Sequence, residues 1–267
     1  MHTLTLDELL HMLDEDDGLY DPARFAHIAR IPLMNGHDLD GVFKAFSYGN
    51  SLRFHLLFRQ SPSDESIRLA LNKLAQIAQE YPKDTRLLCY SQIQGFSTAL
   101  LDRLPGCTHP HHFYCYRVKR EAVDTAVELR GLVSRKCTAD MIDACIEVLE
   151  EVFTPHPDAP GSFLRDKDRI TANFLDESGG AILFFKNDAL VGFCGHKRGH
   201  ITETAVRKAY QGQGYGEVIV RSTLKSIAEA GHDAKLTVDH DNHRAIALYE
   251  NVGFTRGYES MRVTLSR

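Results

Sequence analysis

The chain has 267 residues, which fits one large or two smaller domains, and its 43% hydrophobic content is typical of a globular protein. A net charge of −5 argues against broad binding to nucleic acid and weakly favours a cationic acceptor. The sequence shows neither a secretory signal nor an apolar run of the ~20 residues that span a membrane, so we expect a cytoplasmic protein with no membrane partner.

The N-terminal half has the pattern of a small α/β unit that follows helices within residues 5–48. Ser61-Pro62 is a strong helix-start signal, and apolar residues recur behind it with a helical period from Ile67 to Ala78. The expected elements are, in chain order, strand Leu52–Phe58, helix Ser63–Glu80, strand Arg86–Ser91, helix Phe96–Leu104 and strand His111–Val118.

The six cysteines show no paired spacing, and we expect reduced thiols rather than disulfides. The segment Cys107–Cys115 combines cysteines and histidines and has enough soft ligands for zinc. It lacks the C-x₂-C and H-x₃₋₅-H spacing of structural zinc sites. A turn that leads into an edge strand fits this segment better, so the sequence predicts no metal.

The C-terminal half alternates strands and helices from about Val127 onward. Thr138 suits a helix N-cap, and Asn187-Asp188 has the composition of a hairpin turn. The expected elements are strand Leu129–Cys137, a helix after Thr138, helix Phe163–Leu175, strands Ala181–Phe185 and Leu190–His196, strand Ile201–Val206, a helix, strand Lys235–Asp239, a second helix and strand Tyr258–Leu265.

A glycine-rich loop separates strand Ile201–Val206 from the helix that follows it. The loop reads Gln211-Gly212-Gln213-Gly214-Tyr215-Gly216. Glycine has no Cβ, so its backbone approaches an anion closely and adopts a positive φ where a turn requires it. The N–H groups of such a loop and of the first helical turn favour a phosphate, as does the helix dipole. The loop therefore predicts a phosphate site.

The residues that the loop lacks narrow the choice of ligand. No Gly-Lys-Ser/Thr is present, as a P-loop would need for a γ-phosphate and Mg²⁺. A dinucleotide fingerprint started at Gly212 meets Glu217 where it needs glycine. The remaining pattern, Gln211-x-x-Gly214-x-Gly216, resembles motif A of the GNAT acyltransferase superfamily. The resemblance implies acetyl-CoA as co-substrate, with its pyrophosphate on this loop.

A second segment, after strand Lys235–Asp239, has a characteristic spacing of residue types. It reads N-x-x-A-x-x-L-Y-E-x-x-G-F from Asn242 to Phe254 and resembles motif B of the same superfamily nearly position for position. Asn242 suits a helix N-cap, and Gly253 suits the stop after a helix. The alternative is an ordinary amphipathic helix with a glycine stop, and the order of the two motifs favours the resemblance.

The order of elements from residue 123 onward resembles a complete GNAT fold. The resemblance implies an α/β (α+β) fold whose central mixed, mostly antiparallel sheet is splayed between two parallel strands and flanked by helices. We expect this domain over residues 123–267 and a second, smaller α/β domain over residues 1–122. The smaller domain has the strand spacing of half a GNAT fold but no glycines near Asp64-Glu65. We interpret it as the silent first module of a tandem array; an unrelated α/β cap is the alternative.

The resemblance assigns roles to residues of both motifs. Tyr249 matches the motif B tyrosine that acts as general acid toward the leaving thiolate, and a phenol of pKa ~10 stays protonated at neutral pH. The pantetheine arm is expected between the splayed strands, paired with the backbone near Ala205 and Val206, and Asn242 is expected to hydrogen-bond it.

The general base has more than one candidate. Glu203 lies in the motif A strand, where family members often carry a glutamate that deprotonates the amine. His200 has the more suitable ordinary pKa of ~6.5, and His196 ends the preceding strand. Simple alternation places Glu203 and His200 on opposite faces, but the family's strand usually carries a bulge here, which reverses such parity. The sequence favours Glu203 slightly over His200 and leaves open that neither is the base.

These observations predict an N-acetyltransferase that moves an acetyl group from acetyl-CoA to the primary amine of a small molecule. The alternatives are a protein or peptide N-acetyltransferase and a non-catalytic acetyl-CoA sensor. We expect no metal and no nucleic-acid partner, and a monomer or a homodimer. The acceptor itself cannot be read from the sequence, because its pocket is built from helices and loops before the motif A strand.

Overall fold

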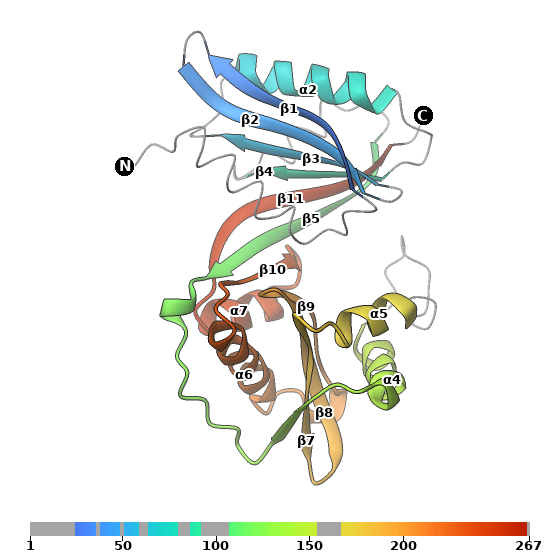
Figure 1. Cartoon of the computed structure of the whole chain (residues 1–267), viewed down its shortest axis with the longest axis vertical. Helices are drawn as coiled ribbons and strands as arrows, with labels where there is room; N and C mark the ends of the chain where they lie inside the picture. The colour runs from blue at the N-terminus through green and yellow to red at the C-terminus, as the bar shows by residue number, and fades with distance from the viewer. Residues whose placement is uncertain are drawn as a thin grey trace. The chain divides into compact units, whose positions relative to one another are not determined.

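The computed structural model describes residues 25–35, 38–48, 51–58, 64–79, 86–91, 107–153 and 167–265 (Figure 1). Their backbone divides into two compact units. Unit 1 comprises the described residues up to Cys115 together with those from Gly257, and unit 2 comprises Tyr116–Arg256. The helix expected at Phe96–Leu104 lies outside the described residues.

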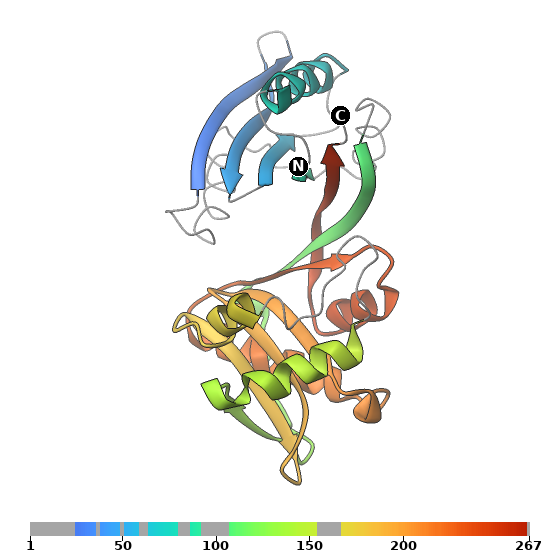
Figure 2. The same cartoon turned by 90° about the vertical axis from the view of Figure 1, so that its right-hand side faces the viewer.

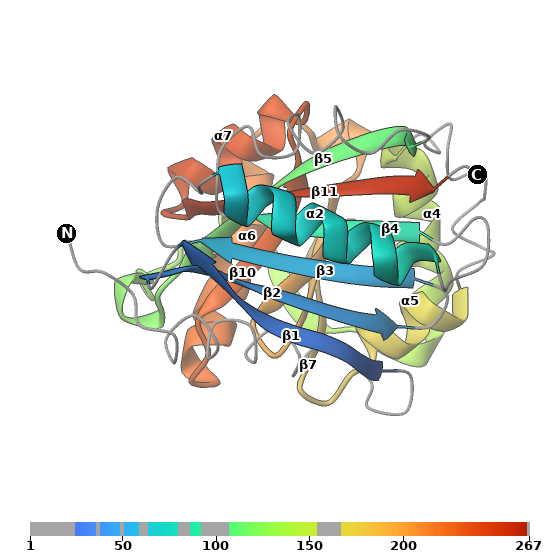
Figure 3. The ribbon, with the colours of Figure 1, turned by 90° about the horizontal axis from the view of Figure 1, so that it is seen from above.

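Unit 1 is a mixed sheet with one described helix. Its strands lie in the order β1-β2-β3-β4-β11-β5. The parallel neighbours β3 and β4 are joined through α2, which lies across one face of the sheet (Figure 3). Buried Phe43 and Phe54 pack with ring centroids 5.6 Å apart, and Ala70 and Leu74 of α2 are buried too. The elements are β1 (Phe25–Asn35), β2 (Asp38–Tyr48), β3 (Ser51–Phe58), α2 (Asp64–Gln79), β4 (Arg86–Ser91), β5 (Cys107–Val118) and β11 (Thr255–Leu265).

The helices expected within residues 5–48 are wrong for residues 25–48, which form the antiparallel pair β1 and β2. The two strands meet where Asn35 pairs with Asp38. Asn35-Gly36 is a strong hairpin signal when apolar runs flank it, and this signal should have excluded a continuous helix. Residues 41–46 of β2 are all buried, Lys44 included, so both faces of this strand are covered.

Strand β11 also differs from the expectation. The sequence groups its residues with the C-terminal half, but Glu259–Thr264 pair antiparallel with Arg86–Ser91 of β4, within unit 1. Strand β5 begins at Cys107, so the turn expected near that residue is part of the strand.

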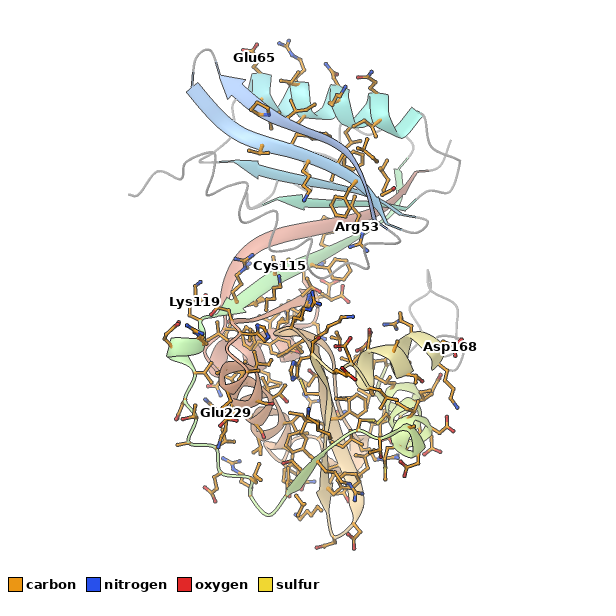
Figure 4. The ribbon with its side chains drawn as sticks, viewed as in Figure 1. Arg53, Glu65, Cys115, Lys119, Asp168 and Glu229 are labelled. Carbon is orange, nitrogen blue, oxygen red and sulfur yellow. The ribbon has the colours of Figure 1, made fainter. Side chains whose placement is uncertain are left out.

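Unit 2 is a sheet with helices on both faces. Its strands lie in the order β10-β9-β8-β7-β6. Helices α4 and α5 cover one face, and α6 and α7 the other (Figure 2). Figure 4 labels Asp168 on α5 and Glu229 at the end of α6, on the two sides of this sheet. The elements are η2 (Arg120–Ala122), β6 (Val133–Lys136), η3 (Ala139–Met141), α4 (Ile142–Val152), α5 (Lys167–Phe174), β7 (Gly179–Lys186), β8 (Ala189–Lys197), β9 (His200–Val206), η5 (Lys208–Tyr210), α6 (Tyr215–Glu229), β10 (Ala234–Asp239) and α7 (His243–Asn251).

The core beneath α4 and α5 holds these helices on the sheet. Phe174 of α5 and Phe193 of β8 pack edge to face with ring centroids 5.1 Å apart, and both are buried. Burying an aromatic side chain of this kind stabilises a fold by roughly 1.5–3 kcal/mol. The turn expected at Asn187-Asp188 is confirmed, because both residues have positive φ, 48° and 61°, as a tight hairpin turn requires.

Two expectations at the start of unit 2 hold only in part. Strand β6 is shorter than the expected Leu129–Cys137, because the residues before it form a tight turn in which Leu132 N donates to Leu129 O at 2.9 Å. Thr138 occupies an N-cap position as expected, but it is that of the short helix η3; its side chain makes no capping hydrogen bond, and α4 begins only at Ile142. None of the described helices has the length and apolar character needed to cross a membrane.

Candidate functional site

The parallel strands β9 and β10 separate soon after they meet. Their register pairs a single position, Lys235 with His200, and Lys235 N donates to Gly199 O at 3.0 Å. Beyond that point the register between the two strands ends. The splay predicted for the motif A strand is therefore present, and it leaves a gap beside the C-terminal part of β9.

A bulge in β9 decides which face each side chain of this strand occupies. Cys194 pairs with Thr204 and His196 pairs with Ile201, so Gly195 of β8 stands opposite both Thr202 and Glu203. Two residues on one strand against one on the other reverse the alternation of side chains.

The contacts of the neighbouring side chains agree with this reversal. Glu203 reaches α5, and a Cβ on Gly195 would lie 2.8 Å from Thr202 Oγ1 and 3.3 Å from the Phe174 ring of α5, so the consecutive residues Thr202 and Glu203 share the α5 face. Thr204 contacts Cys194, whose thiol faces α6 on the other face. The bulge thus moves Glu203 to the face that Thr202 and His200 share by simple alternation.

Among the described residues, only one of the two carboxylate oxygens of Glu203 has a hydrogen-bond partner. Its Oε1 accepts a hydrogen bond from Arg169 Nη1 of α5 at 3.0 Å, and its side chain is 15% exposed. Its Oε2 is buried without a hydrogen-bond partner among the described residues. A buried carboxylate oxygen without a partner is costly, and such an atom is suited to accept a proton or a hydrogen bond from a ligand.

The two histidines near this strand have different environments. His196 lies in β8 and is 3% exposed; burial, with the nearby charge of Lys136, lowers the pKa of its imidazole. Its imidazole is therefore neutral at pH 7. Alternation along β8 places His196 on the same face as Cys194, which is the α6 side, away from Glu203. His200 is partly buried at the one position where β9 and β10 pair, before the strands separate.

Tyr249 lies on the opposite side of β9 from Glu203. It belongs to α7, its ring packs against Phe254 at 5.7 Å between centroids, and it is 8% exposed. Its hydroxyl hydrogen-bonds with Thr204, and burial raises the pKa of Tyr249 to about 12. The phenol is thus protonated throughout the neutral range. Cys194 Sγ lies 3.3 Å from Thr204 Oγ1, and burial raises the pKa of this thiol to about 11.

Helix α7 is held in place at both ends. Asn242 caps it as predicted, because its Oδ1 accepts from Ala245 N at 3.1 Å. Tyr116 of β5 donates to Glu250 at 2.7 Å, next to Tyr249. Directly after the C-terminal end of α7, Gly253 has a φ of 102°, which fits its predicted role as the helix stop.

The glycine loop has the backbone conformation that its sequence predicts. Gly212 and Gly214 have φ values of 77° and 81°, and Gly214 is the N-cap of α6, which begins at Tyr215. A Cβ on Gly212 would meet nothing within 4 Å, so the positive φ, and not a lack of space, favours glycine there. At Gly216 a Cβ would lie 3.5 Å from Leu248, an ordinary contact, so a small side chain would fit at that position.

Side chains tie this loop to β9 and α7. Gln211 Nε2 donates to Val206 O at 2.8 Å, and Gln211 Oε1 accepts from Arg244 Nη1 at 2.8 Å. Gln213 Nε2 donates to Ala209 O at 3.0 Å. The loop is thus fixed beside the last residues of β9, where the gap opens, and its first helical turn provides N–H groups for an anion.

Three residues of this region have no sequence signal that marks them as part of the site: Arg169, Thr204 and Arg130. Arg169 pairs with Glu203, and Thr204 contacts Tyr249 through its hydroxyl. Arg130 Nη1 lies 2.7 Å from the position that a Cβ on Gly214 would occupy. Each belongs to an element distant in sequence from its partner or lies beyond the bulge, so no local pattern marks it. No group of three or more potential metal-ligating side chains gathers within the described ranges.

Comparison with known proteins agrees with this geometry. The model of the acetyltransferase (GNAT) family matches residues 142–254. These residues form a GNAT acetyltransferase domain. A mycothiol acetyltransferase from Streptomyces scabiei is 32% identical over 111 residues, which cover 39% of this chain and 36% of that protein. The matched stretch therefore spans well under two thirds of this curated relative.

Solved structures share the fold over more of the chain. A GCN5-related N-acetyltransferase from Sphaerobacter thermophilus superposes with a TM-score of 0.55 at 17% identity, covering 86% of this chain and 82% of that one. A tandem GNAT protein from the clavulanic acid biosynthesis pathway gives a TM-score of 0.51 at 12% identity, covering 92% and 84%. At these identities the likeness shows the fold alone. The α/β fold with a mixed sheet flanked by helices, expected from the sequence, is thereby confirmed.

Proposed function

We propose that this protein transfers the acetyl group of acetyl-CoA to the primary amine of a small molecule. One observation carries the proposal: Glu203 and Tyr249 lie on opposite faces of the same bulged strand, beside the gap between β9 and β10. The GNAT domain and the glycine loop at the end of that gap support acetyl-CoA as the donor. The curated relatives are named for acetylation of a small molecule, which supports a small acceptor over a protein.

The chemistry requires three proton transfers. The acceptor amine enters as an ammonium, which has no lone pair, so it first gives one proton to Glu203, the proposed acceptor, through Oε2 or one bridging water. The neutral nitrogen then attacks the thioester carbonyl carbon. The carbon–sulfur bond breaks, the departing thiolate takes the hydroxyl proton of Tyr249, and the new amide nitrogen loses its second proton, which returns to the phenolate through water. A phenol with a pKa of about 12 is a protonated donor at neutral pH. His200 remains the alternative base.

The proposed donor site is the loop from Gln211 to Gly216 for the pyrophosphate, with the backbone near Ala205 and Val206 for the pantetheine arm. The positive φ of Gly214 and the exposure of Gly212, Gln213 and Gly214 directly before α6 support the first assignment. The separation of β10 from β9 supports the second, because a strand edge without a partner pairs with an extended ligand. Unit 1 is proposed to be a catalytically silent module. The cytoplasmic location and the monomer or homodimer remain predictions.

A direct test measures the release of free thiol from acetyl-CoA in the presence of a panel of amines, aminoglycosides and peptides, with mass spectrometry of the products. Thiol release that depends on one class of small amine, with a product heavier by one acetyl group, would support the proposal. Release with peptides only would assign the protein variant of the activity. Tight CoA binding with no release across the panel would favour the sensor.

A further inference from the structure

Arg130 occupies a tight turn that fixes the conformation of its backbone. Leu132 N donates to Leu129 O at 2.9 Å across the turn, and the two central residues, Arg130 and Gly131, have φ values of 49° and 78°. Two positive φ values in succession characterise a type I′ turn. Positive φ is uncommon for a residue with a side chain, so the conformation of Arg130 is imposed by the turn and not by its own preference.

The turn brings the guanidinium of Arg130 against the glycine loop. A Cβ on Gly214 would lie 2.7 Å from Arg130 Nη1, well inside van der Waals contact. The guanidinium thus occupies the space that a side chain at position 214 would need. Gly214 is also the N-cap of α6, where the backbone N–H groups of the first turn point away from the helix.

Among the described residues, Arg130 differs from the other arginines near this loop in having no side-chain partner. Arg207 pairs with Glu151, and Arg221 pairs with Glu217. Arg244 donates to the Gln211 side chain. Within the part of the chain that the structure describes, no carboxylate or other hydrogen-bond acceptor pairs with Arg130. An exposed guanidinium that lies at a helix N-terminus without an acidic partner among the described residues adds a full positive charge to a site that already favours anions.

We propose that Arg130 binds the pyrophosphate of acetyl-CoA, as a second source of positive charge beside the N–H groups of the glycine loop. This inference rests on the proposed function. A guanidinium matches two phosphate oxygens with parallel hydrogen bonds, which an N–H group alone cannot do. The residue lies before the stretch that the GNAT family model matches, so its role belongs to this chain's turn and not to motif A.

The chain offers a matched control for this arginine. Arg198 and Gly199 form the turn between β8 and β9 with φ values of 47° and 80°, nearly the same as those of Arg130 and Gly131. The nearest atoms to a Cβ on Gly199 belong to Asp233 and His232, not to the glycine loop. Arg198→Gln therefore removes the same charge from the same turn conformation at a different place.

The test is calorimetry of CoA binding to the full chain and to the variants Arg130→Gln, Arg130→Lys and Arg198→Gln. Arg130→Gln should raise the Kd for CoA roughly tenfold to a hundredfold, the effect of losing a charge-assisted hydrogen bond. Arg198→Gln should leave the Kd unchanged, and Arg130→Lys should recover part of the loss. Equal melting temperatures for the two glutamine variants verify that both fold.

A second ligand identifies the phosphate involved. With 3′-dephospho-CoA, which keeps the pyrophosphate, the ratio of the Kd values of Arg130→Gln and wild type should be the same as with CoA. If the ratio falls to one, Arg130 contacts the 3′-phosphate and the assignment is wrong. An unchanged Kd for CoA in Arg130→Gln would overturn the inference and leave the proposed function intact. A wild-type chain that does not bind CoA would overturn both.

Discussion

The two parallel strand pairs of this molecule differ in a way that explains why only one of them offers a ligand site. In unit 1, β3 and β4 pair continuously at six positions, from Ser51 with Arg86 to Leu56 with Ser91. In unit 2, β9 and β10 pair at one position and then separate. Both pairs are joined by a crossover helix. The same β-α-β arrangement is thus closed in one unit and open in the other.

Two local features accompany the difference. Strand β9 carries a bulge at Thr202-Glu203 against β8, whereas β3 pairs with β2 without a shift along its whole length. The crossover helix α6 begins after Gly214 with its positive φ, whereas α2 begins at Asp64-Glu65. Glu65 is exposed near the start of its helix (Figure 4), where a negative charge repels an anion. A ligand site in this arrangement therefore needs both an open strand pair and a helix start built on glycine; the one acidic residue in the first turn of α6, Glu217, pairs with Arg221 at 2.9 Å.

Among variants beside the open strand pair β9–β10, Tyr249→Phe is expected to have the largest effect on activity. The variant keeps the ring that packs against Phe254 but removes the proton donor, so kcat should fall ~10²–10⁴-fold. CoA affinity should stay within twofold, roughly, since the ring remains in place. Steady-state kinetics and calorimetry on the same preparation check both. Turnover at the wild-type rate would make Tyr249 structural and assign the proton to a water.

The next largest effect on activity is expected from replacing the proposed general base. Glu203→Gln should lower kcat/KM by about 10²-fold and flatten the acidic limb of its pH profile, because the amide cannot accept a proton. His200→Ala should leave that limb in place. The two variants separate the candidates, and the opposite pattern would assign the role to His200.

Arg169→Gln is the matched control for the ion pair of Glu203. It breaks the hydrogen bond to Oε1 but keeps the carboxylate. We expect the acidic limb to remain in this variant, because the carboxylate that accepts the proton is still present. A flattened limb in Arg169→Gln would mean that the ion pair, and not the carboxylate itself, gives the profile its shape.

A smaller effect is expected from Gly214→Asp, which adds a Cβ at positive φ and a negative charge at the start of α6. CoA affinity should fall roughly tenfold or more. Gly231→Asp is its control at the other end of the same helix, where φ is 84° and Arg120 Nη1 would lie 3.8 Å from the added Cβ. Both variants should lose roughly 1–2 kcal/mol of stability from the strained backbone, measured by urea denaturation. Only Gly214→Asp should weaken CoA binding, and equal affinities in the two variants would contradict the assignment of the loop.

The smallest effect is expected in the closed pair. Glu65→Gln removes a charge near the start of α2 without opening β3 from β4, so CoA binding should not change. Calorimetry should give one CoA per chain for the wild type and for this variant. A second CoA per chain would show that unit 1 is not silent and would remove the contrast between the two pairs.

The sequence predicts the parts of this site that depend on short-range chemistry. The glycine loop, the Asn242 cap and the Gly253 stop all follow from which residues tolerate a positive φ or can accept a backbone N–H, and the structure confirms each. The turn at Asn187-Asp188 follows in the same way. These features are determined within a few residues of one another.

The missed features depend on residues far apart in the chain. The face of Glu203 depends on a bulge that exists only in the pairing of β9 with β8, and its partner Arg169 comes from a different helix. Arg130 meets Gly214 only because a turn before β6 folds back to the loop. The error over residues 25–48 is of another kind, because the Asn35-Gly36 signal was present in the sequence.

The position of β11 has a consequence for how the chain reaches its folded state. This strand lies between β4 and β5 in the sheet of unit 1, yet it follows the whole of unit 2 in the sequence. During synthesis, β4 and β5 therefore emerge from the ribosome without the strand that separates them. Contacts of such large sequence separation form slowly, because the chain must lose the entropy of a long loop before they are made. Unit 2 can complete its own core first, and the last strand then closes a sheet whose first strands were made earliest.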